Sequence, residues 1–394
     1  MKIGLKDYKD VHFSRDIIIL YSNRMLLQIA FGVVGIFFPI FFFLEFNYSF
    51  LTVALIYILV YTGHGLLTPI GAKLIKLFGM RRLMIISVPF ALLGMGVMYF
   101  WEVNPISVLF THILLITLYK VLYWVPYHVD FALFADRKAR GRQLSVLLNI
   151  SELVLVFTPL LGGFIIAVYG FQSIFIISTI IFLAAIPSLF LISSNPKEEY
   201  SYGYFETFKH LFKKENRPIL LGYSADGAQA TVSSVIWPIF IFLLLDEKFL
   251  TVGIVASLTL IVVIVFQLLV GDLIDRWSRK KVLTIGSILY STGWIIKTFV
   301  ETAFQIFLVD AYHNLGRTVS RVSIDTNTYI QSVDNGHYID EFTALKEIAL
   351  NLGRVLMLIF VIIVVSFATI KVTFIAAAIT TLFITILNRQ VAVT

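Results

Sequence analysis

The stretch Gly271-Asp-Leu-Ile-Asp-Arg-Trp-Ser-Arg-Lys-Lys281 is a short polar segment between two long apolar runs, Phe249–Val270 and Val282–Val300. Each run holds about 20 residues, the length that an α-helix needs to cross a hydrocarbon core roughly 30 Å thick. The segment is so short that the chain must turn back at once, and Gly271 permits a close backbone approach there. Because cytoplasmic loops of membrane proteins carry an excess of Lys and Arg, the four cations of this segment predict that it faces the cytoplasm.

The composition of the whole chain agrees with this interpretation. Of its 394 residues, 59% are hydrophobic and 14% are charged, and the mean hydropathy is +0.90. A soluble domain of this length could not bury so much apolar surface, so the sequence predicts a polytopic membrane protein. The absence of cysteine excludes disulfides and thiol chemistry. The net charge of +7 is spread over alternate loops, which indicates membrane orientation rather than nucleic-acid binding.

Hydrophobic runs predict an all-α membrane protein with twelve transmembrane helices in two halves of six. The predicted spans are residues 17–43, 50–75, 83–100, 105–131, 145–168, 172–193, 218–245, 249–271, 282–300, 303–328, 343–367 and 369–388. The expected divisions are an N-terminal segment 1–16, a first half 17–193, a linker 194–217 with a short interfacial helix, a second half 218–388 and a tail 389–394. The loop cations place both termini in the cytoplasm.

The two halves share a sequence repeat. Pro39-Ile-Phe-Phe-Phe-Leu44 and Phe50-Leu-Thr-Val53 return as Pro238-Ile-Phe-Ile-Phe-Leu243 and Phe249-Leu-Thr-Val252. The offset is 199 residues in both parts, from 39 to 238 and from 50 to 249. The same offset sets Lys76 where the second half has Asp275. Parallel repeats of six spans are one of the architectures of secondary transporters.

On these residues the chain resembles the major facilitator superfamily. The loop signature of that family runs Gly-x-x-x-Asp-Arg-x-Gly-Arg-Lys, and it is matched here by Gly271, Asp275, Arg276, Arg279 and Lys280, with Ser278 at the second glycine. The first-half copy is degraded, with Ala72 and Lys76 for the glycine and aspartate but with Gly79, Arg81 and Arg82 in place. Thr158-Pro-Leu-Leu-Gly-Gly163 is similar to an element in the fifth span of many exporters of the family. The resemblance implies a transporter and leaves the substrate open.

The resemblance also implies that spans one, four, seven and ten line a central cavity. The residues expected to contact substrate there are Arg24, Gln28, Tyr119, Lys120, Tyr123, Gln229, His313, Asn314 and Arg317. A charge near the bilayer centre costs roughly 2.5–3.5 kcal/mol, so these cations should face water or a partner. The alternative is structural pairing, such as Asp310 with Arg317 or Arg24 with Asp226. Lys297, near the outer end of its span, is expected to extend toward the headgroups.

Proton coupling is expected from Asp226, Glu152 and Glu347, because burial raises the pKa of a carboxylate toward neutrality. The aromatic residues in 119–127 could stack an aromatic ligand, and ordinary helix packing explains them equally well. The sequence has no phosphate-binding glycine loop, no zinc-binding helix motif and no acidic cluster. No enzymatic activity, metal or cofactor is therefore expected.

The loop charges suggest two cytoplasmic gates. Lys76, Arg81 and Arg82 are expected to face the acidic start of span eleven, at Asp340 and Glu341. Gly271, Asp275, Arg276 and Arg279 are expected to lie beside the basic start of span five. Each exposed pair would contribute about 0–1 kcal/mol. The alternative is that these cations only fix the orientation in the membrane.

The sequence thus predicts a monomeric secondary transporter of a small organic solute in the plasma membrane. We expect alternating access, coupling to protons, and antiport-driven export rather than import. Two alternatives remain: proton-linked uptake of a small anionic metabolite, and a non-transporting receptor or lipid-binding protein on the same scaffold. The expected partners are the solute, protons and the lipid bilayer, and not nucleic acid.

Overall fold

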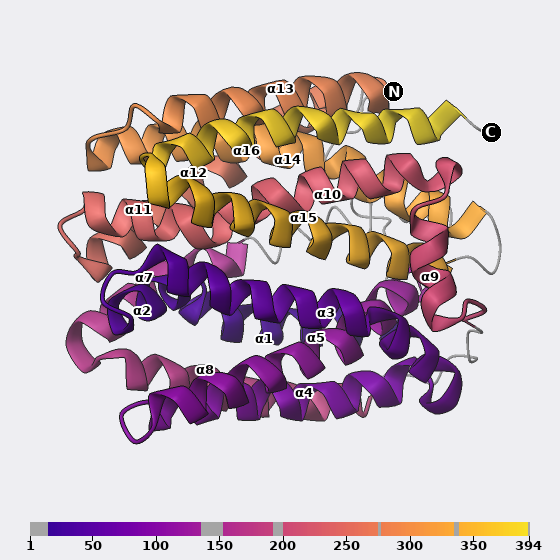
Figure 1. Ribbon diagram of the computed structural model, residues 1–394, viewed down its shortest axis with the longest axis horizontal. Helices are drawn as coiled ribbons and strands as arrows, with labels where there is room; N and C mark the ends of the chain where they lie inside the picture. Colours follow the sequence, from indigo (N-terminus) through magenta and orange to yellow (C-terminus); the bar gives the residue numbers. More distant parts are fainter. Residues whose placement is uncertain (1–14, 135–152, 192–199, 275–276, 335–338, 393–394) are drawn as a thin grey trace.

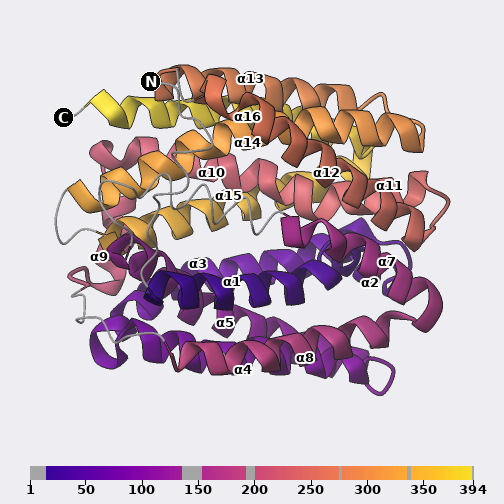
Figure 2. The same cartoon turned by 180° about the vertical axis from the view of Figure 1, so that it is seen from behind.

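The computed structural model describes residues 15–134, 153–191, 200–274, 277–334 and 339–392, and every regular element in these ranges is a helix. The long helices run roughly along the longest axis of the molecule (Figure 1). The first turn of α1 (Arg15–Val34) and the last turn of η4 (Ile384–Ala392) lie at the same end (Figure 2). Because both lie at one end, the chain between them runs the length of the molecule an even number of times.

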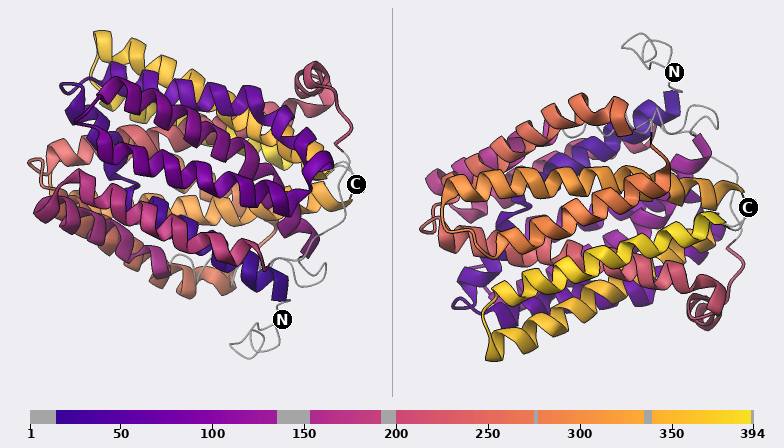
Figure 3. Two further views of the ribbon diagram at one scale, coloured as in Figure 1. Left: turned by 90° about the horizontal axis from the view of Figure 1, so that it is seen from below. Right: turned by 90° about the horizontal axis from the view of Figure 1, so that it is seen from above.

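The first group of helices is drawn in indigo to magenta and fills the lower part of Figure 1. It comprises α1, α2 (Phe37–Glu45), α3 (Phe50–Phe78), α4 (Met80–Gly96) with its extension η1 (Val97–Phe100), α5 (Pro105–Phe134), α7 (Phe157–Tyr169) and α8 (Phe171–Leu189). The predicted linker helix follows as α9 (Tyr204–Leu211) and η2 (Lys214–Asn216). In Figure 3 the pink α9 projects at the end of the molecule where the chain also finishes.

The second group, drawn in pink to yellow, fills the upper part of Figure 1. It comprises α10 (Arg217–Thr231), the π-helix η3 (Val232–Ile236), α11 (Trp237–Leu244), α12 (Phe249–Ile274), α13 (Arg279–Lys297), α14 (Ala303–Asp334), α15 (Ile339–Phe367), α16 (Lys371–Phe383) and η4. In the part of the chain that the structure describes, nine helical segments are long and apolar enough to cross a membrane. Residues Leu153–Tyr169 form a shorter apolar helix.

The loops that precede α3 and α12 have the same unusual backbone. Asn47 and Tyr48 have φ of 53° and 63°, and Asp246 and Glu247 have φ of 54° and 60°. This left-handed region is uncommon for residues other than glycine. The hydrogen bond from Tyr48 N to Phe43 O (2.7 Å) also returns as one from Glu247 N to Phe242 O (3.0 Å). Two loops with one rare conformation at an offset of 199 residues support the internal repeat, and Tyr48 Oη donates to Glu247 Oε2 at 3.0 Å.

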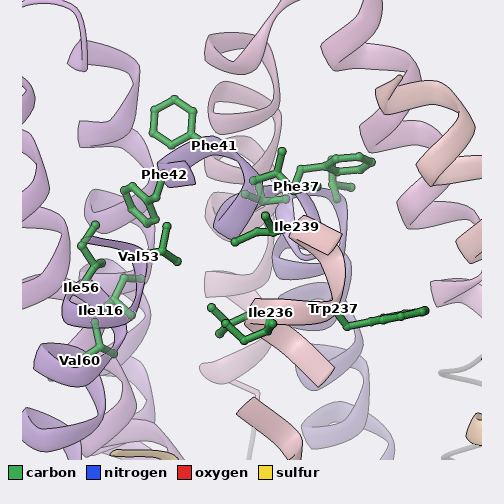
Figure 4. Packing of buried hydrophobic residues seen from close by; sticks show 14 of the residues in the cluster. Phe37, Phe41, Phe42, Val53, Ile56, Val60, Ile116, Ile236, Trp237 and Ile239 are labelled. Carbon is green, nitrogen blue, oxygen red and sulfur yellow. The ribbon is translucent and has the colours of Figure 1, made fainter. Parts of the chain in front are cut away.

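The first helix of each group is interrupted ahead of a proline. The break between α1 and α2 precedes Pro39, and the π-helix between α10 and α11 precedes Pro238. Proline has no backbone N–H, so the carbonyl four residues earlier loses its helical partner and the helix bends there. Figure 4 shows that Ile239 of α11 lies next to Phe37 of α2, whereas Trp237 points away from them. The two bends therefore meet in the apolar core.

Glycines let α7 approach α12 closely. A Cβ atom on Gly163 would lie 2.5 Å from Phe249 O, and one on Gly253 would lie 2.4 Å from Pro159 O. Leu160 N also donates to Ser257 Oγ at 3.1 Å across this contact. The Thr158–Gly163 element is therefore a site of close helix packing in this protein, and in itself it indicates no direction of transport.

Candidate functional site

Three tyrosines form a buried ladder on α5. The rings of Tyr119 and Tyr123 stack at 5.2 Å, and those of Tyr123 and Tyr127 stack at 5.6 Å. Their spacing of four residues places them on one face of the helix. The guanidinium of Arg24, on α1, lies 4.4 Å from the Trp124 ring and 5.4 Å from the Tyr127 ring. The structure thus brings together three residues that the sequence analysis assigned to substrate, Arg24, Tyr119 and Tyr123.

Two cations from different helices contact a single aromatic ring. Lys120 Nζ, on α5, and Arg354 Cζ, on α15, each lie 5.0 Å from the centre of the Tyr61 ring of α3. Both residues lie near the middle of their helices. A cation gains only about 0.5–2 kcal/mol from a ring face, which does not offset the cost of a charge at this depth. The ring therefore compensates these two positive charges only in part, and a negative charge placed beside them would stabilise them.

A polar network continues from this point between α3 and α15. Asn351 Nδ2 and His64 Nδ1 are 2.9 Å apart, and Arg354 donates to Asn351 Oδ1 at 3.0 Å. Further along α15, Glu347 Oε1 lies 4.0 Å from Nε2 of His128, on α5. Glu347 was expected to couple protons, and the structure places it beside an imidazole rather than in a strong ion pair.

Asp226 is held in a polar chain within the second group of helices. Its carboxylate accepts from Arg321 at 3.1 Å and from Gln229 Nε2 at 2.9 Å. Gln229 Oε1 in turn accepts from the hydroxyl of Tyr290. The alternative pairing of Arg24 with Asp226 is therefore wrong, because the arginine nearest to Asp226 comes from α14.

The expectation for Lys297 is also wrong. This side chain is fully buried, and its Nζ lies 2.8 Å from Asp310 Oδ1. The Nζ atom also lies 4.1 Å from the Trp237 ring and 4.5 Å from the Trp294 ring, while Trp237 Nε1 donates to Asp310 Oδ2 at 3.0 Å. A carboxylate on the next helix provides a partner inside the protein, so Lys297 turns inward and Asp310 pairs with it instead of with Arg317.

The other expected residues of α14 have different surroundings. His313 is buried, and its ring lies 4.5 Å from that of Tyr290 and 4.6 Å from that of Trp294. Asn314 donates to Asp310 O at 2.9 Å. Arg317 is exposed and makes no ion pair with the described residues. The structure thus packs His313 among aromatic rings and leaves Arg317 accessible.

Five buried polar atoms among the expected substrate residues make no hydrogen bond with the described residues. They are Gln28 Oε1, on α1, the hydroxyls of Tyr119 and Tyr123, on α5, and both ring nitrogens of His313, on α14. Buried polar groups in proteins are almost always hydrogen-bonded, so such atoms suggest a place for a ligand or ordered water. The atoms of Gln28, Tyr119 and Tyr123 lie on the two helices that also carry Arg24 and Lys120.

The residues expected to form the gates are only partly placed. Glu341 is buried and its Oε1 accepts from Ser201 N at 2.9 Å and Ser201 Oγ at 2.6 Å, while Arg81 donates to Phe190 O. Asp340 is also buried, Lys76 and Arg82 are exposed, and Gly271 lies within α12. Asp275, Arg276 and Glu152 lie outside the described residues, as does the side chain of Arg279. The gates therefore stay a prediction.

Sequence reasoning missed several members of the central cluster. They are Tyr61 on α3 and Asn351 and Arg354 on α15. A signal was present, because Glu347, Asn351 and Arg354 follow one another at steps of four and three and so share a helix face. The resemblance implies a cavity lined by spans one, four, seven and ten. Within the eleventh span, only Glu347 was therefore predicted to be functional.

Comparison with known proteins identifies the family of this chain. The family model described as Major Facilitator Superfamily matches residues 20–225. No curated protein matches the chain. The matched residues make up more than half of the chain and include α1, α3 and α5, which carry Arg24, Tyr61 and Lys120. The chain belongs to the Major Facilitator Superfamily.

Proposed function

We propose that this protein is a secondary active transporter of a small organic anion. Its family consists of transporters, which supplies the general class. The anion is suggested by a surplus of positive charge in the middle of the helices. Among the described carboxylates there, Asp226 and Asp310 are each in an ion pair, and Glu347 lies 4.0 Å from His128. Lys120, Arg354, Arg317 and Arg24 have no carboxylate within salt-bridge distance in the described part of the chain.

The depth of these cations along their helices determines how strongly a bound anion would stabilise them. Lys120, Arg354 and Arg317 each lie about 14 or 15 residues from the first residue of their helix, roughly 21–23 Å at 1.5 Å per residue. Each costs about 2.5–3.5 kcal/mol at such a depth. A carboxylate about 4 Å from one of them would gain about 4 kcal/mol at an effective dielectric constant of 20. Binding of an anion between Lys120 and Arg354 would therefore offset the cost of both.

The surroundings of this charge suit an organic rather than an inorganic anion. The stacked rings of Tyr119 and Tyr123 lie on the helix that carries Lys120 and continue to Tyr127, whose ring is 5.4 Å from the guanidinium of Arg24. The hydroxyl of Tyr119 and Oε1 of Gln28 are available for polar groups of the solute. Sites for small molecules are mostly apolar with a few polar groups that fix orientation. We infer a small carboxylate with a planar or aromatic body.

We further propose that the chain crosses the plasma membrane twelve times, as a monomer of two six-helix halves with both termini in the cytoplasm. The shared loop conformation at an offset of 199 residues and the paired bends before Pro39 and Pro238 support the repeat. Alternating access would then arise from rocking of the halves about the central cations. The charged cytoplasmic residues Lys76, Asp340 and Glu341 would take part in closing the inner side.

We propose that transport is coupled to protons and runs inward with the proton. An anion with one negative charge that enters with one proton carries no net charge, so the membrane potential does not oppose its uptake. This favours uptake over the export expected from the Thr158–Gly163 element. That element packs α7 against α12, a role that is independent of direction.

The experiment is a binding screen followed by a flux measurement on the purified protein. Acetate, lactate, malate, benzoate and phthalate are each compared with the corresponding amide by thermal shift in detergent. We expect at least one carboxylate to stabilise the protein more than its amide, and the same solute to exchange across the membrane of proteoliposomes. If no carboxylate exceeds its amide, the anion proposal fails. Binding of a carboxylate without any flux would instead establish the receptor alternative.

A further inference from the structure

The linker helix α9 lies across the ends of the long helices. In Figure 1 it runs crosswise to them, and both panels of Figure 3 show it at the edge of the molecule. Because the long helices cross the membrane roughly along its normal, α9 runs roughly parallel to the membrane plane. It lies at the end of the molecule that holds both termini of the described chain, the side expected to face the cytoplasm.

One face of α9 packs on the protein. Leu211 is buried in an apolar cluster that includes Phe342 of α15, and Phe208 packs against the same cluster. Thr207 is also buried, and its Oγ1 lies 2.6 Å from the hydroxyl of Tyr200. These contacts fix the helix against the start of α15 and determine which of its side chains point outward.

The outward face of α9 is apolar and exposed. Phe205 is 83% exposed, and Phe212, directly after the helix, is 61% exposed. Exposed Lys209 follows Phe205 by four residues and precedes Phe212 by three, so the three side chains share one side of the helix. The segment does not itself cross the membrane, so two exposed rings on it indicate a surface that binds something apolar.

Cations border the two rings. The exposed cations of this segment are Lys209, Lys213, Lys214 and Arg217. Residues 204–217 contain these four cations and two carboxylates, Glu206 and Glu215, which gives a net charge of +2 with histidine neutral. A helix with aromatic side chains beside lysines binds the interface of a membrane, and acidic lipids of the cytoplasmic leaflet strengthen that binding.

The helix is formed before it meets a lipid. At its start, the N–H of Gly203 donates to Glu206 Oε2 at 2.9 Å, and beyond its end Asn216 Nδ2 donates to His210 O at 2.9 Å. The ring of Tyr202 stacks on that of His210 at 4.0 Å. A helix of eight residues is unstable alone in water, so these contacts and the packing on α15 hold it in shape. Binding through its outer face therefore requires no folding.

We propose that this outer face of α9, defined by Phe205, Lys209 and Phe212, docks on the acidic phospholipids of the cytoplasmic leaflet. The two rings enter the boundary between headgroups and acyl chains, and the exposed cations contact lipid phosphates. An acidic protein would satisfy the cations, but the bilayer offers an apolar layer for both rings at the level where α9 lies. The inference goes beyond the proposed function, because it does not depend on the solute.

The size of the effect follows from the charges. One Lys or Arg near an acidic leaflet strengthens binding about fivefold, so three of them together contribute about a hundredfold. This attraction is screened by salt, since the Debye length falls from about 8 Å at 0.15 M to about 3 Å at 1 M. Docking should therefore need acidic lipid and weaken at high salt.

The test is hydrogen exchange at α9 in the full-length protein, in nanodiscs of phosphatidylcholine alone or mixed equally with phosphatidylglycerol. We expect the protection factors of α9 to be at least about fivefold higher in the acidic discs and to lose this rise in about 1 M salt. The triple variant Lys209→Gln, Lys213→Gln, Lys214→Gln should show no rise. The matched control Lys73→Gln, Arg82→Gln, Lys281→Gln removes three exposed cations outside the linker and should keep it.

A second pair of variants tests the rings. Phe205→Ser with Phe212→Ser should abolish the rise in acidic discs, whereas Phe299→Ser with Phe367→Ser, which removes two rings that are 73% and 88% exposed elsewhere, should keep it. An unchanged unfolding temperature in detergent shows that each variant is folded.

Equal protection of the unaltered protein in the two kinds of disc overturns the inference, and so does a full rise in either α9 variant. If the acidic discs have no effect but soluble polyglutamate raises the protection, the face binds an acidic protein and the lipid proposal is wrong.

Discussion

Removal of one partner of the Lys297–Asp310 pair should destabilise the protein far more than removal of both. Among the described residues, Lys297→Met leaves a buried carboxylate with only the N–H of Trp237 as partner, and Asp310→Asn leaves a buried ammonium held by two indole faces. Loss of one partner of a buried ion pair costs about 3–5 kcal/mol, whereas replacement of the whole pair by side chains of similar volume is close to neutral. The double variant should therefore be nearly as stable as the unaltered protein.

The assay is thermal unfolding in detergent, followed by the fluorescence of the 5 tryptophans, two of which contact the pair. We expect each single variant to unfold at a clearly lower temperature and the double variant to recover most of the loss, a coupling of about 3 kcal/mol or more. Lys248 and Asp246 form an exposed pair that serves as control, and replacement of both should show no measurable coupling. If the effects of Lys297→Met and Asp310→Asn simply add, the two charges do not stabilise each other and the interpretation of this pair is wrong.

Two further predictions concern packing and the linker. Gly353→Ala should lower the unfolding temperature markedly, because its Cβ would lie 1.8 Å from Ser224 O, a backbone atom of α10; overpacking of this kind costs about 1–3 kcal/mol or more. Gly96→Ala, whose Cβ would lie 3.6 Å from its nearest neighbour, should be tolerated, and equal effects would contradict the close approach of α10 and α15. In the linker, the N–H of Gly203 bonds to Glu206 and lowers the pKa of that carboxyl. The bond should stabilise the start of α9 at neutral pH and lose this effect as the pH falls through the lowered pKa. The protection factors for hydrogen exchange at the start of α9 should therefore fall in acid, and a Glu206→Gln variant whose protection factors fall in the same way would refute the assignment.

Much of the helical layout follows from local sequence. Apolar runs of membrane-spanning length predict helices such as 50–75 and 249–271, and the structure has α3 at Phe50–Phe78 and α12 at Phe249–Ile274. The repeat was visible because Pro39 and Pro238 precede nearly identical segments, and the structure adds the matching left-handed loops. These features depend on residues close in sequence, which is why a single chain is enough to predict them.

The partners of the embedded charges were harder to predict. Lys297 lies near the end of a span, where a lysine usually extends toward the headgroups, and only the three-dimensional arrangement shows that Asp310 is within reach. Asp226 likewise could have paired with any arginine at its depth, and the structure selects Arg321. Such pairings depend on the rotation of each helix about its axis, which hydropathy does not determine. The same holds for Arg354, whose contact with Tyr61 joins helices far apart in sequence.

The central claim is that the cations beside Tyr61 bind the negative charge of a transported solute. The most direct measurement is the thermal shift produced by phthalate and by its diamide in the unaltered protein and in two variants, Lys120→Gln and Arg354→Gln. A hydrogen bond to a charged group contributes about 1.5–3 kcal/mol, so each variant should bind phthalate at least about tenfold more weakly. Lys73→Gln, at an exposed position on α3, should leave the shift unchanged. The account predicts that phthalate stabilises the unaltered protein more than its diamide does and that both central variants lose this preference; an equal response to the two compounds, or one that survives in both variants, would contradict it.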